Sequence, residues 1–241
     1  MEHPTPIEAL RVKIFGDGAQ EKDILEMAEK SYVQGFTTNP SLMREAGVSN
    51  YTEFAKGLLT KVTNKPLSFE VFSDDLASME REARIIHSWG ENVYVKIPVT
   101  NTSGEWTTPL IKTLAREGIK LNVTAILTPA QVAEVAGALS KETPAIVSVF
   151  AGRVADTGRD PLPLMRECKA LLRELPLAEL LWASCREVYN IYEAEEVGAD
   201  IITVPYSVLH KLGSIGVDLE EFSLEGVKAF YKAGQDSGFT I

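Results

Sequence analysis

The sequence predicts an α/β protein that folds as one closed (β/α)8 barrel with an additional C-terminal helix. Three observations carry this prediction. Short apolar segments alternate with helical segments, and eight such strand–helix units follow one another along the chain. The length of 241 residues is close to the typical length of about 250 residues for such a barrel. No linker or change of composition interrupts the series, so we expect a single domain over residues 1–241.

The first half of the chain supplies four of these units. The expected strands are Val12–Phe15, Gly35–Thr38, Leu67–Phe72 and Asn92–Ile97, the last one closed by Pro98. Apolar residues at helical spacing predict a helix through Ile24 and Met27, a helix over Tyr51–Val62, another over Leu76–Trp89 and one through Leu110 and Leu114.

The second half repeats the alternation. The expected strands are Ile119–Leu127, Ala145–Phe150, Leu180–Ala183 and Ile201–Val204. The expected helices are Pro129–Leu139, which has proline in its first turn, Pro161–Leu175, Val188–Val197 and further segments up to Gly234. The alternative is an open, doubly wound sheet. That fold usually has fewer strands, and Gly16-x-Gly18 lacks the third glycine of its phosphate-binding loop.

The composition excludes several classes of protein. There are 24 Lys and Arg against 34 Asp and Glu, a net charge of −10, which argues against nucleic-acid or anionic-membrane partners but still allows a local basic pocket. Two cysteines, Cys168 and Cys185, are too few for a disulfide framework. His3, His87 and His210 stand too far apart for a histidine-rich metal site. Met1–Leu10 does not resemble a signal peptide, and no apolar run could span a membrane, so we expect a cytoplasmic protein.

The fourth expected strand carries a lysine on its polar side. Successive side chains of a strand point to opposite faces, so Val93, Val95 and Ile97 share one face, and Tyr94 and Lys96 share the other. We expect the apolar face to pack under the helices and Lys96 to point into the barrel. A buried lysine is costly unless it is paired, neutralised or functional.

The other strands repeat this alternation. The residues expected to face the helices are Leu67, Phe69, Val71, Leu121, Val123, Ala125, Val147 and Val149. Those expected to face the interior include Ser68 and Phe150, with Phe15 on the side of Asp17 and with Ser184 at the end of the seventh strand. Active sites of such barrels lie at the C-terminal strand ends. The polar side chains expected to converge there are Lys96, Glu70, Asp17, Asn122, Thr124 and Ser148.

This set of residues favours covalent catalysis. A lysine whose charged form is disfavoured by burial has a lowered pKa and can attack a carbonyl to form a Schiff base. The imine withdraws electrons, so a neighbouring carbon–carbon bond can break or form. Glu70 and Asp17 are the candidates for moving protons, with a bridging water.

Each of these residues also has a purely structural explanation. The alternatives are a buried ion pair of Lys96 with Glu70, a helix cap by Asp17 near Gln20, a turn before a helix at Asn39-Pro40 and a core network of Asn122 with Thr124. Six polar positions at one rim make the joint structural explanation the weaker one.

The motifs around these residues together resemble those of the transaldolases, a group of Schiff-base barrel enzymes. The resemblance runs from Lys13 to Pro205. The motifs are Thr37-Thr38-Asn39-Pro40-Ser41-Leu42, Ser68-Phe69-Glu70-Val71, Val95-Lys96-Ile97-Pro98, Asn122-Val123-Thr124, Ser148-Val149-Phe150-Ala151-Gly152-Arg153 and Ala183-Ser184-Cys185-Arg186. Any one of them alone would be a weak signal.

The resemblance implies a role for each matched position. Lys96 matches the Schiff-base lysine, Glu70 and Thr124 the pair that holds the catalytic water, and Asp17 the acid/base group at the sugar hydroxyl. The matched substrate-binding positions are Asn39, Asn122, Ser148, Phe150, Arg153, Ser184 and Arg186, of which Arg153, Ser184 and Arg186 would hold a phosphate. Paired arginines suit a phosphate because each donates in a fork. The structural alternative for Arg186 is a solvated residue at a helix start.

Details within the motifs separate related activities. Glu70 and Phe150 are the transaldolase choices at positions where the related fructose 6-phosphate aldolases carry glutamine and tyrosine. Departures from the family pattern are Val149 within the strand-six motif, the longer segment Asn101–Trp106 expected at the rim, and Cys185 with Glu187 beside the phosphate positions, where Glu187 would weaken anion binding.

The resemblance therefore implies transfer of a dihydroxyacetone unit from sedoheptulose 7-phosphate to glyceraldehyde 3-phosphate, a pentose phosphate pathway reaction that needs no cofactor or metal. Sugar phosphates would be its partners. The alternatives are a class I aldolase of the same fold and a non-catalytic barrel that senses a phosphorylated sugar. Small relatives form rings through their C-terminal helix, so we expect a homo-oligomer; Leu224–Ala233 could equally cover its own barrel.

Overall fold

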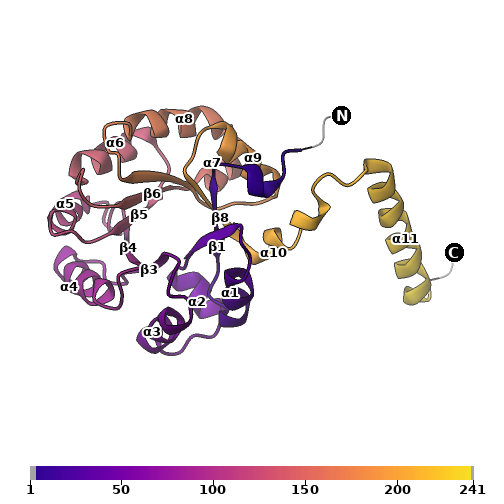
Figure 1. Cartoon of the computed structure of the whole chain (residues 1–241), viewed down its shortest axis with the longest axis horizontal. Helices are drawn as coiled ribbons and strands as arrows, with labels where there is room; N and C mark the ends of the chain where they lie inside the picture. The colour runs from indigo at the N-terminus through magenta and orange to yellow at the C-terminus, as the bar shows by residue number, and fades with distance from the viewer. Residues whose placement is uncertain (1–3, 240–241) are drawn as a thin grey trace.

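The computed structural model describes residues 4–239 and contains a closed barrel of eight parallel strands, which confirms the predicted (β/α)8, or TIM barrel, fold (Figure 1). The strands are β1 (Lys13–Asp17), β2 (Val33–Thr37), β3 (Leu67–Glu70), β4 (Val93–Pro98), β5 (Leu121–Ile126), β6 (Ala145–Val149), β7 (Ala178–Trp182) and β8 (Ile201–Pro205). Pairing of β1 with β8 closes the barrel and rules out the open sheet.

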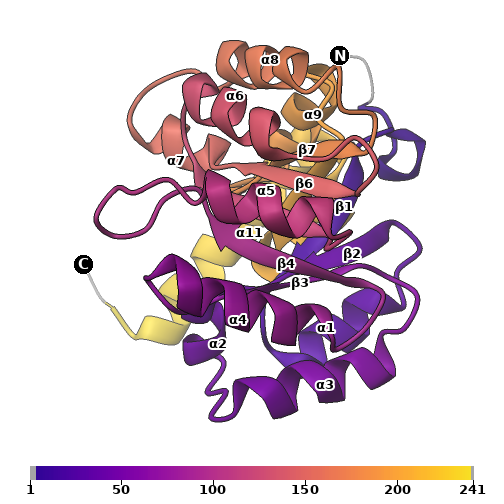
Figure 2. The same cartoon turned by 90° about the vertical axis from the view of Figure 1, so that its left-hand side faces the viewer.

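Helices surround the strands on the outside (Figure 2). The helices of residues 4–239 are α1 (Glu21–Ala28), α2 (Pro40–Glu45), α3 (Tyr51–Lys61), α4 (Leu76–His87), α5 (Thr108–Arg116), α6 (Pro129–Ala138), α7 (Ala151–Asp156), α8 (Leu162–Leu171), α9 (Tyr189–Glu196), α10 (Tyr206–Leu209) and α11 (Leu219–Ser237), with short 3-10 turns at η1 (Ile7–Ala9) and η2 (Leu212–Ser214). None of the helices within residues 4–239 combines the length and apolar composition that crossing a membrane requires.

The differences from the expected elements are small. β3 and β7 end earlier than expected, at Glu70 and Trp182. Of the two short helices α2 and α7, α7 was not expected, and α2 was expected only in the alternative that places a turn before a helix at Asn39-Pro40. Each has six residues, too few to show a helical period in the sequence. His3 lies outside the described residues.

The alternation along β4 has the expected outcome. Val93, Val95 and Ile97 are buried in the same apolar cluster as Met79 of α4 and Ile111 of α5. The outer faces of the strands and the inner faces of the helices therefore form the main core. A second, smaller cluster is separate from this main core. It is built from Phe15, Ile146, Leu181, Ala183 and Ile201, with Tyr94 and Phe150 packed against it.

Ala125 does not follow the alternation. The sequence predicts that it faces the helices, but it lies in the wall of the cavity at the C-terminal strand ends. The reason is a local irregularity: the pairing of β5 with β6 shifts register between Val123 and Ile126, and Ala125 has a φ of 62°. An extra residue in a strand reverses the facing of the side chains at that point. The prediction for Ala125 is therefore wrong.

Helix α11 stands away from the barrel (Figure 1). Its N-terminus is capped by Asp218, whose carboxylate accepts hydrogen bonds from the backbone of Glu220 and Glu221. None of its residues is buried. The alternative in which this helix covers its own barrel is therefore not what the structure has.

Candidate active site

A cavity of about 620 Å³ opens at the C-terminal ends of the strands. Its lining contains ten of the eleven residues that the sequence singles out: Asp17, Asn39, Glu70, Lys96, Thr124, Ser148, Phe150, Arg153, Ser184 and Arg186. The eleventh, Asn122, is fully buried and contacts the lining residue Ser148. The expected convergence of polar side chains at this end of the barrel is therefore observed.

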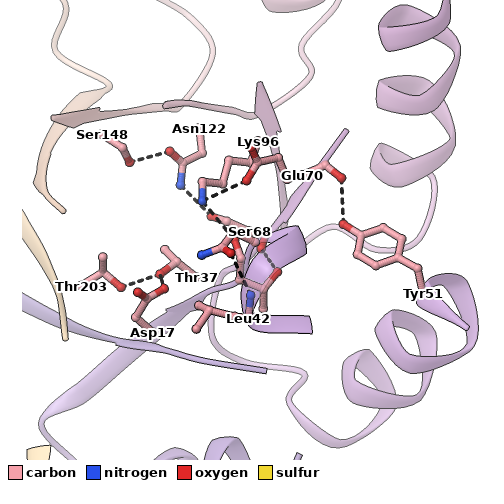
Figure 3. A network of polar contacts seen from close by, with 12 residues as sticks. Asp17, Thr37, Leu42, Tyr51, Ser68, Glu70, Lys96, Asn122, Ser148 and Thr203 are labelled. Carbon is pink, nitrogen blue, oxygen red and sulfur yellow. Dashed lines mark hydrogen bonds and ion pairs between the residues drawn. The ribbon is translucent and has the colours of Figure 1, made fainter. Parts of the chain in front are cut away.

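Lys96 lies at the centre of these contacts (Figure 3). Its Nζ is 3.2 Å from Oε2 of Glu70 and donates a hydrogen bond of 3.1 Å to the carbonyl oxygen of Thr38. Only 9% of the lysine side chain is exposed, against 17% of the glutamate side chain. The predicted ion pair exists, and it holds the amine within the cavity rather than in the helical layer.

Tyr51 fixes the end of β3 that carries Glu70. Its hydroxyl donates a hydrogen bond of 2.9 Å to the backbone carbonyl of Glu70. Burial raises the pKa of Tyr51, so the hydroxyl stays protonated and remains a donor. The ring packs edge-to-face against Phe69, Phe72 and Trp89. Glu70 is thus held by an aromatic group on the outer layer.

Asn122 links two serines beneath the cavity. The Ser148 hydroxyl donates a hydrogen bond of 2.6 Å to Oδ1 of Asn122, and Nδ2 of Asn122 donates one of 2.9 Å to Oγ of Ser68. The core-network alternative therefore describes Asn122 correctly. It does not describe Thr124, whose buried Oγ1 has no hydrogen-bond partner within residues 4–239.

Asp17 is held by the Thr37 hydroxyl and does not cap a helix. Thr37 Oγ1 donates a hydrogen bond of 2.7 Å to Oδ1 of Asp17, while the N-cap of α1 is Gln20, with no side-chain cap bond. Burial raises the pKa of Asp17, and the nearby Lys96 charge and the Thr37 hydrogen bond oppose that rise. The carboxylate is thus more basic than an ordinary aspartate.

Asn39 combines a structural and a site position. Its side chain caps α2 by accepting a hydrogen bond of 3.0 Å from the backbone of Leu42, and Pro40 occupies the first turn. The turn alternative is thus correct as well. The same residue also lies in the cavity wall, so the cap fixes the position of its amide at the rim.

The β6 and β7 ends form a cationic side of the cavity. The Arg153 guanidinium lies 4.6 Å from the ring centroid of Phe150, and Arg186 pairs with Asp156 at 2.5 Å. Arg186 is half exposed at the start of the segment leading to α9, so its solvated-residue alternative is partly right. Its position in the lining still allows one guanidinium edge to meet a ligand.

Gly152 permits the C-terminal ends of β6 and β7 to approach each other closely. Ser184 has a φ of 63°, a conformation that costs energy for a residue with a side chain. A Cβ at Gly152 would lie 1.7 Å from the carbonyl oxygen of Ser184. Only glycine fits at this position of α7, where the helix lies against the Ser184 backbone. Gly152 therefore sets the geometry of the rim.

Cys185 is a lining residue but not a reactive thiol. Burial raises its pKa to about 12, and Sγ donates to the carbonyl oxygen of Glu187 at 3.4 Å. The thiolate is the nucleophilic form, and it is not populated near neutral pH. The loop Asn101–Trp106 lies at the same end of the barrel without lining the cavity; Thr102 bonds to Asp74 through its backbone N–H and its hydroxyl.

Several residues of the cavity wall lie outside the set predicted from the sequence. They include Thr37, Ser41, Glu45, Ala125, Leu181 and Thr203. Thr37 belongs to a quoted motif and ends β2, and Thr203 lies two positions beyond Ile201 on the inner face of β8, so alternation along β8 was the signal that could have found it. No group of three or more His, Cys, Asp or Glu side chains in residues 4–239 is placed to hold a metal ion.

Comparisons with known proteins identify the family of the chain. The family model described as Transaldolase/Fructose-6-phosphate aldolase matches residues 14–241. A probable transaldolase of Thermoplasma volcanium is 37% identical over 83% of this chain and 87% of its own length. A probable transaldolase 2 of Listeria monocytogenes is 36% identical over 92% and 95%.

A solved structure shows the same fold at low sequence identity. Dihydrodipicolinate synthase of Rhodopseudomonas palustris has a TM-score of 0.51 and 16% identity, covering 84% of this chain and 72% of its own. This likeness concerns the fold alone. The family match over nearly the whole chain, and relatives above 30% identity, carry the assignment: the chain belongs to the transaldolase/fructose-6-phosphate aldolase family.

Proposed function

We propose that the protein is a transaldolase that moves a dihydroxyacetone unit from sedoheptulose 7-phosphate to glyceraldehyde 3-phosphate, giving erythrose 4-phosphate and fructose 6-phosphate. The observation that carries the proposal is the Lys96 amine, held 3.2 Å from Glu70 in a cavity that also contains Asp17. An enclosed amine beside two carboxylates suits Schiff-base chemistry on a ketose. The names of the curated relatives support the same activity.

Imine formation is the first step of the proposed reaction. Within the ion pair, the Lys96 ammonium passes one proton to Glu70, and the amine then attacks the ketose carbonyl carbon. Glu70 returns that proton to the carbonyl oxygen, takes a second proton from the bound nitrogen and delivers it to the resulting hydroxyl, which leaves as water and gives an iminium. The buried Thr124 hydroxyl has no partner within residues 4–239, so it is available to hold the water that connects Glu70 with the substrate.

Carbon–carbon cleavage follows at Asp17. Its carboxylate takes the proton of the C4 hydroxyl, the electrons of that O–H bond form the aldehyde, and the C3–C4 bond breaks. The bonding pair neutralises the iminium and leaves an enamine on Lys96. Burial raises the pKa of Asp17, which makes it a better proton acceptor than an exposed aspartate. Addition of the acceptor aldehyde reverses these steps.

The sugar phosphate end is assigned to Arg153, Ser184 and Arg186. Both arginines lie in the cavity lining and follow β6 and β7 in the chain. A guanidinium fork binds phosphate oxygens with two parallel hydrogen bonds. Asn39, Asn122, Ser148 and Phe150 are assigned to the sugar chain or to holding Lys96 in place.

Borohydride trapping tests the proposal. Reduction in the presence of fructose 6-phosphate is expected to attach the ketose covalently to Lys96, located by peptide mass spectrometry. Lys96→Met is expected to give no adduct and a turnover lower by at least about 10³-fold. Lys120→Met, which removes an amine bonded to the Glu91 carbonyl at the opposite end of the barrel, is the matched control and keeps both. An adduct on another lysine contradicts the assignment, and ligand-induced stabilisation without any adduct indicates a sugar phosphate sensor.

Product analysis separates transfer from cleavage. The family description covers both activities, and the transaldolase proposal predicts that little dihydroxyacetone is released until an acceptor aldose is added. Release of free dihydroxyacetone at the full rate without acceptor identifies an aldolase instead.

We also propose that the protein is a cytoplasmic homo-oligomer joined through α11. Large apolar side chains of α11 are exposed, among them Leu219, Phe222, Val227, Phe230 and Tyr231, and such a surface is typical of an interface. A second copy of the chain is the proposed partner. Light scattering is expected to show an oligomer that Phe222→Glu with Phe230→Glu dissociates; a monomeric wild type contradicts this. The two free thiols fit a reducing compartment.

A further inference from the structure

Two threonines that the sequence analysis did not select lie beside Asp17. Thr37 pairs with Asp17 across β1 and β2, and Thr203 pairs with Phe15 across β1 and β8. Both hydroxyls are buried, with exposed fractions of 3% for Thr37 and 4% for Thr203. Thr37 Oγ1 is 2.7 Å from Oδ1 of Asp17 and 2.5 Å from Oγ1 of Thr203 (Figure 3).

The two hydrogen bonds of Thr37 can have only one arrangement of donors and acceptors. A threonine hydroxyl has a single hydrogen, and Thr37 donates its hydrogen to the Asp17 carboxylate, which can only accept. The hydrogen between the two threonines must then come from Thr203. The result is a directed chain of hydrogen bonds that runs from Thr203 to Thr37 to Asp17.

We propose that Thr37 and Thr203 are positioning residues for Asp17, and that their chain of hydrogen bonds directs the substrate proton to the Oδ2 atom of the carboxylate. This inference rests on the proposed function of Asp17 as the base that starts carbon–carbon cleavage. Oδ1 already accepts from Thr37. Oδ2 accepts no hydrogen bond from the part of the chain that the structure describes, and Asp17 lies in the cavity lining.

The C4 hydroxyl proton moves to Oδ2, the O–H pair becomes the carbonyl bond, and the C3–C4 pair moves into the enamine. The acid form of Asp17 then carries its proton on Oδ2 while Oδ1 keeps accepting from Thr37. The carboxyl plane stays fixed through the step, so the same oxygen can return the proton to the acceptor's aldehyde oxygen in the reverse direction.

Electrostatics agree with this geometry. Burial raises the pKa of Asp17, and the Thr37 hydrogen bond opposes the rise. The ionisable groups that share the cavity with Asp17 are Glu45, Glu70, Lys96, Arg153, Cys185 and Arg186. Of these, only Lys96 acts strongly on Asp17. A neutral hydroxyl chain moderates the basicity of Asp17 without adding a charge that would compete with the substrate phosphate.

Four variants test the positioning role. Thr37→Val removes the donor to Asp17, and Thr203→Val removes the donor to Thr37; Thr37→Ser and Thr203→Ser restore the hydroxyls. Thr143→Val is the matched control because Thr143 is also buried and donates only to the Ala115 carbonyl. The readouts are borohydride trapping, kcat, KM and the acidic limb of the pH profile of kcat/KM, all on the full chain.

Thr37→Val is expected to lower kcat about tenfold, the size of one hydrogen bond to a charged group, with KM unchanged within about twofold. Its acidic limb is expected to move to higher pH, because the hydrogen bond that lowers the pKa of Asp17 is gone. Thr203→Val shifts both quantities in the same direction by less. The serine variants recover wild-type values, Thr143→Val stays at wild type, and trapping of the ketose on Lys96 persists throughout.

Three outcomes each overturn one of these claims. If wild type traps and turns over the ketose but Thr37→Val keeps the wild-type kcat and pH limb, the positioning role is wrong and the proposed function stands. If the pH limb stays in place while kcat and trapping fall together in Thr37→Val and Thr37→Ser, the hydroxyl has only a structural role. If wild type gives no adduct, the proposed function itself fails.

Discussion

The barrel interior has a lower half, towards the N-terminal strand ends, and an upper half, at the C-terminal strand ends. The two halves differ sharply in chemistry although the same strands build both. In four strands, an apolar or aromatic residue in the lower half is followed two positions later by a polar residue in the cavity: Phe15 and Asp17, Tyr94 and Lys96, Ile146 and Ser148, Ile201 and Thr203. The step of two keeps both members on the inner face. A step of two residues along each of these strands thus leads from a packed core to a polar, ligand-sized cavity.

This difference shows how the barrel supports charged groups near its centre. The apolar cluster lies next to the cavity and contributes Leu181, Ala183 and the packed Phe150 to its lining. The low dielectric beneath the polar groups strengthens their interactions, and burial raises the pKa of Asp17. The apolar packing of the lower half stabilises the fold. The burial of charged groups in the upper half lowers that stability and places the groups for chemistry.

Ile146→Ala is expected to have the largest effect on stability, because it opens a hole in the lower half. Ile146 is 1% exposed and packs in the lumen cluster. Removing such a side chain costs about 2–5 kcal/mol of unfolding free energy, measured by urea denaturation. The ketose adduct on Lys96 is expected to remain at temperatures where the variant is folded.

Ser148→Ala, two residues further along β6, is the matched comparison. It removes the donor to Asn122 Oδ1 and is expected to cost about 1 kcal/mol in unfolding free energy while lowering the rate of adduct formation. If Ile146→Ala abolishes trapping in the folded protein, or if Ser148→Ala costs more stability than Ile146→Ala, the division of the interior into two halves is wrong.

The sequence was sufficient to predict the barrel and ten of the 21 residues that line the cavity. Both depend on local periodicity: alternation placed Lys96, Glu70 and Asn122 on the inner face, and all three lie there or directly beneath the cavity. Quoted motifs at Asn39 and Arg153 placed further lining residues at the strand ends, because a parallel barrel brings all these ends to one rim.

The remainder depends on contacts that sequence periodicity does not report. The bulge at Ala125 comes from a register shift between β5 and β6, which is a property of the strand pair. The hydroxyl chain from Thr203 to Asp17 joins residues 186 positions apart, across three neighbouring strands. The position of α11 away from the barrel depends on the path of the segment between α10 and α11. The amphipathic pattern of α11 alone is compatible with several partners.

Gly152→Ala is expected to have the next largest effect, because it breaks the rim of the upper half. Its new Cβ would meet the Ser184 carbonyl oxygen at 1.7 Å, so the β7 end must move. Overpacking of this kind costs about 1–3 kcal/mol of unfolding free energy, and we expect a higher KM for phosphorylated ketoses because Ser184 and Arg186 shift. Gly137→Ala in α6, where nothing lies within 4 Å of the new Cβ, is the control and should be neutral or stabilising. Equal behaviour of the two variants contradicts the packing argument.

Asp17→Asn is expected to have the smallest effect on stability, and the effect has the opposite sign. Burial raises the pKa of Asp17 above the ordinary value of 3.8, so the folded state binds this proton more tightly than the unfolded state. The ionised carboxylate therefore lowers stability at neutral pH, and asparagine, which cannot ionise, is expected to raise the unfolding free energy on the order of 1 kcal/mol. The gain should shrink as the pH falls towards 3.8, where wild-type Asp17 becomes protonated in both states.

Asp75→Asn supplies the contrast outside the cavity, because hydrogen bonds from Ser78 lower the pKa of the exposed Asp75 at the N-cap of α4. The ionised form of Asp75 adds stability above its ordinary pKa, so its asparagine variant should be the less stable protein at neutral pH, with a difference that fades in acid. Urea denaturation of wild type and both variants between pH 7 and pH 4.5 measures the two slopes. Opposite slopes mean that the upper half of the barrel holds its base at a cost in stability; a gain for Asp17→Asn that does not vary with pH would mean that shape, rather than charge, sets that cost.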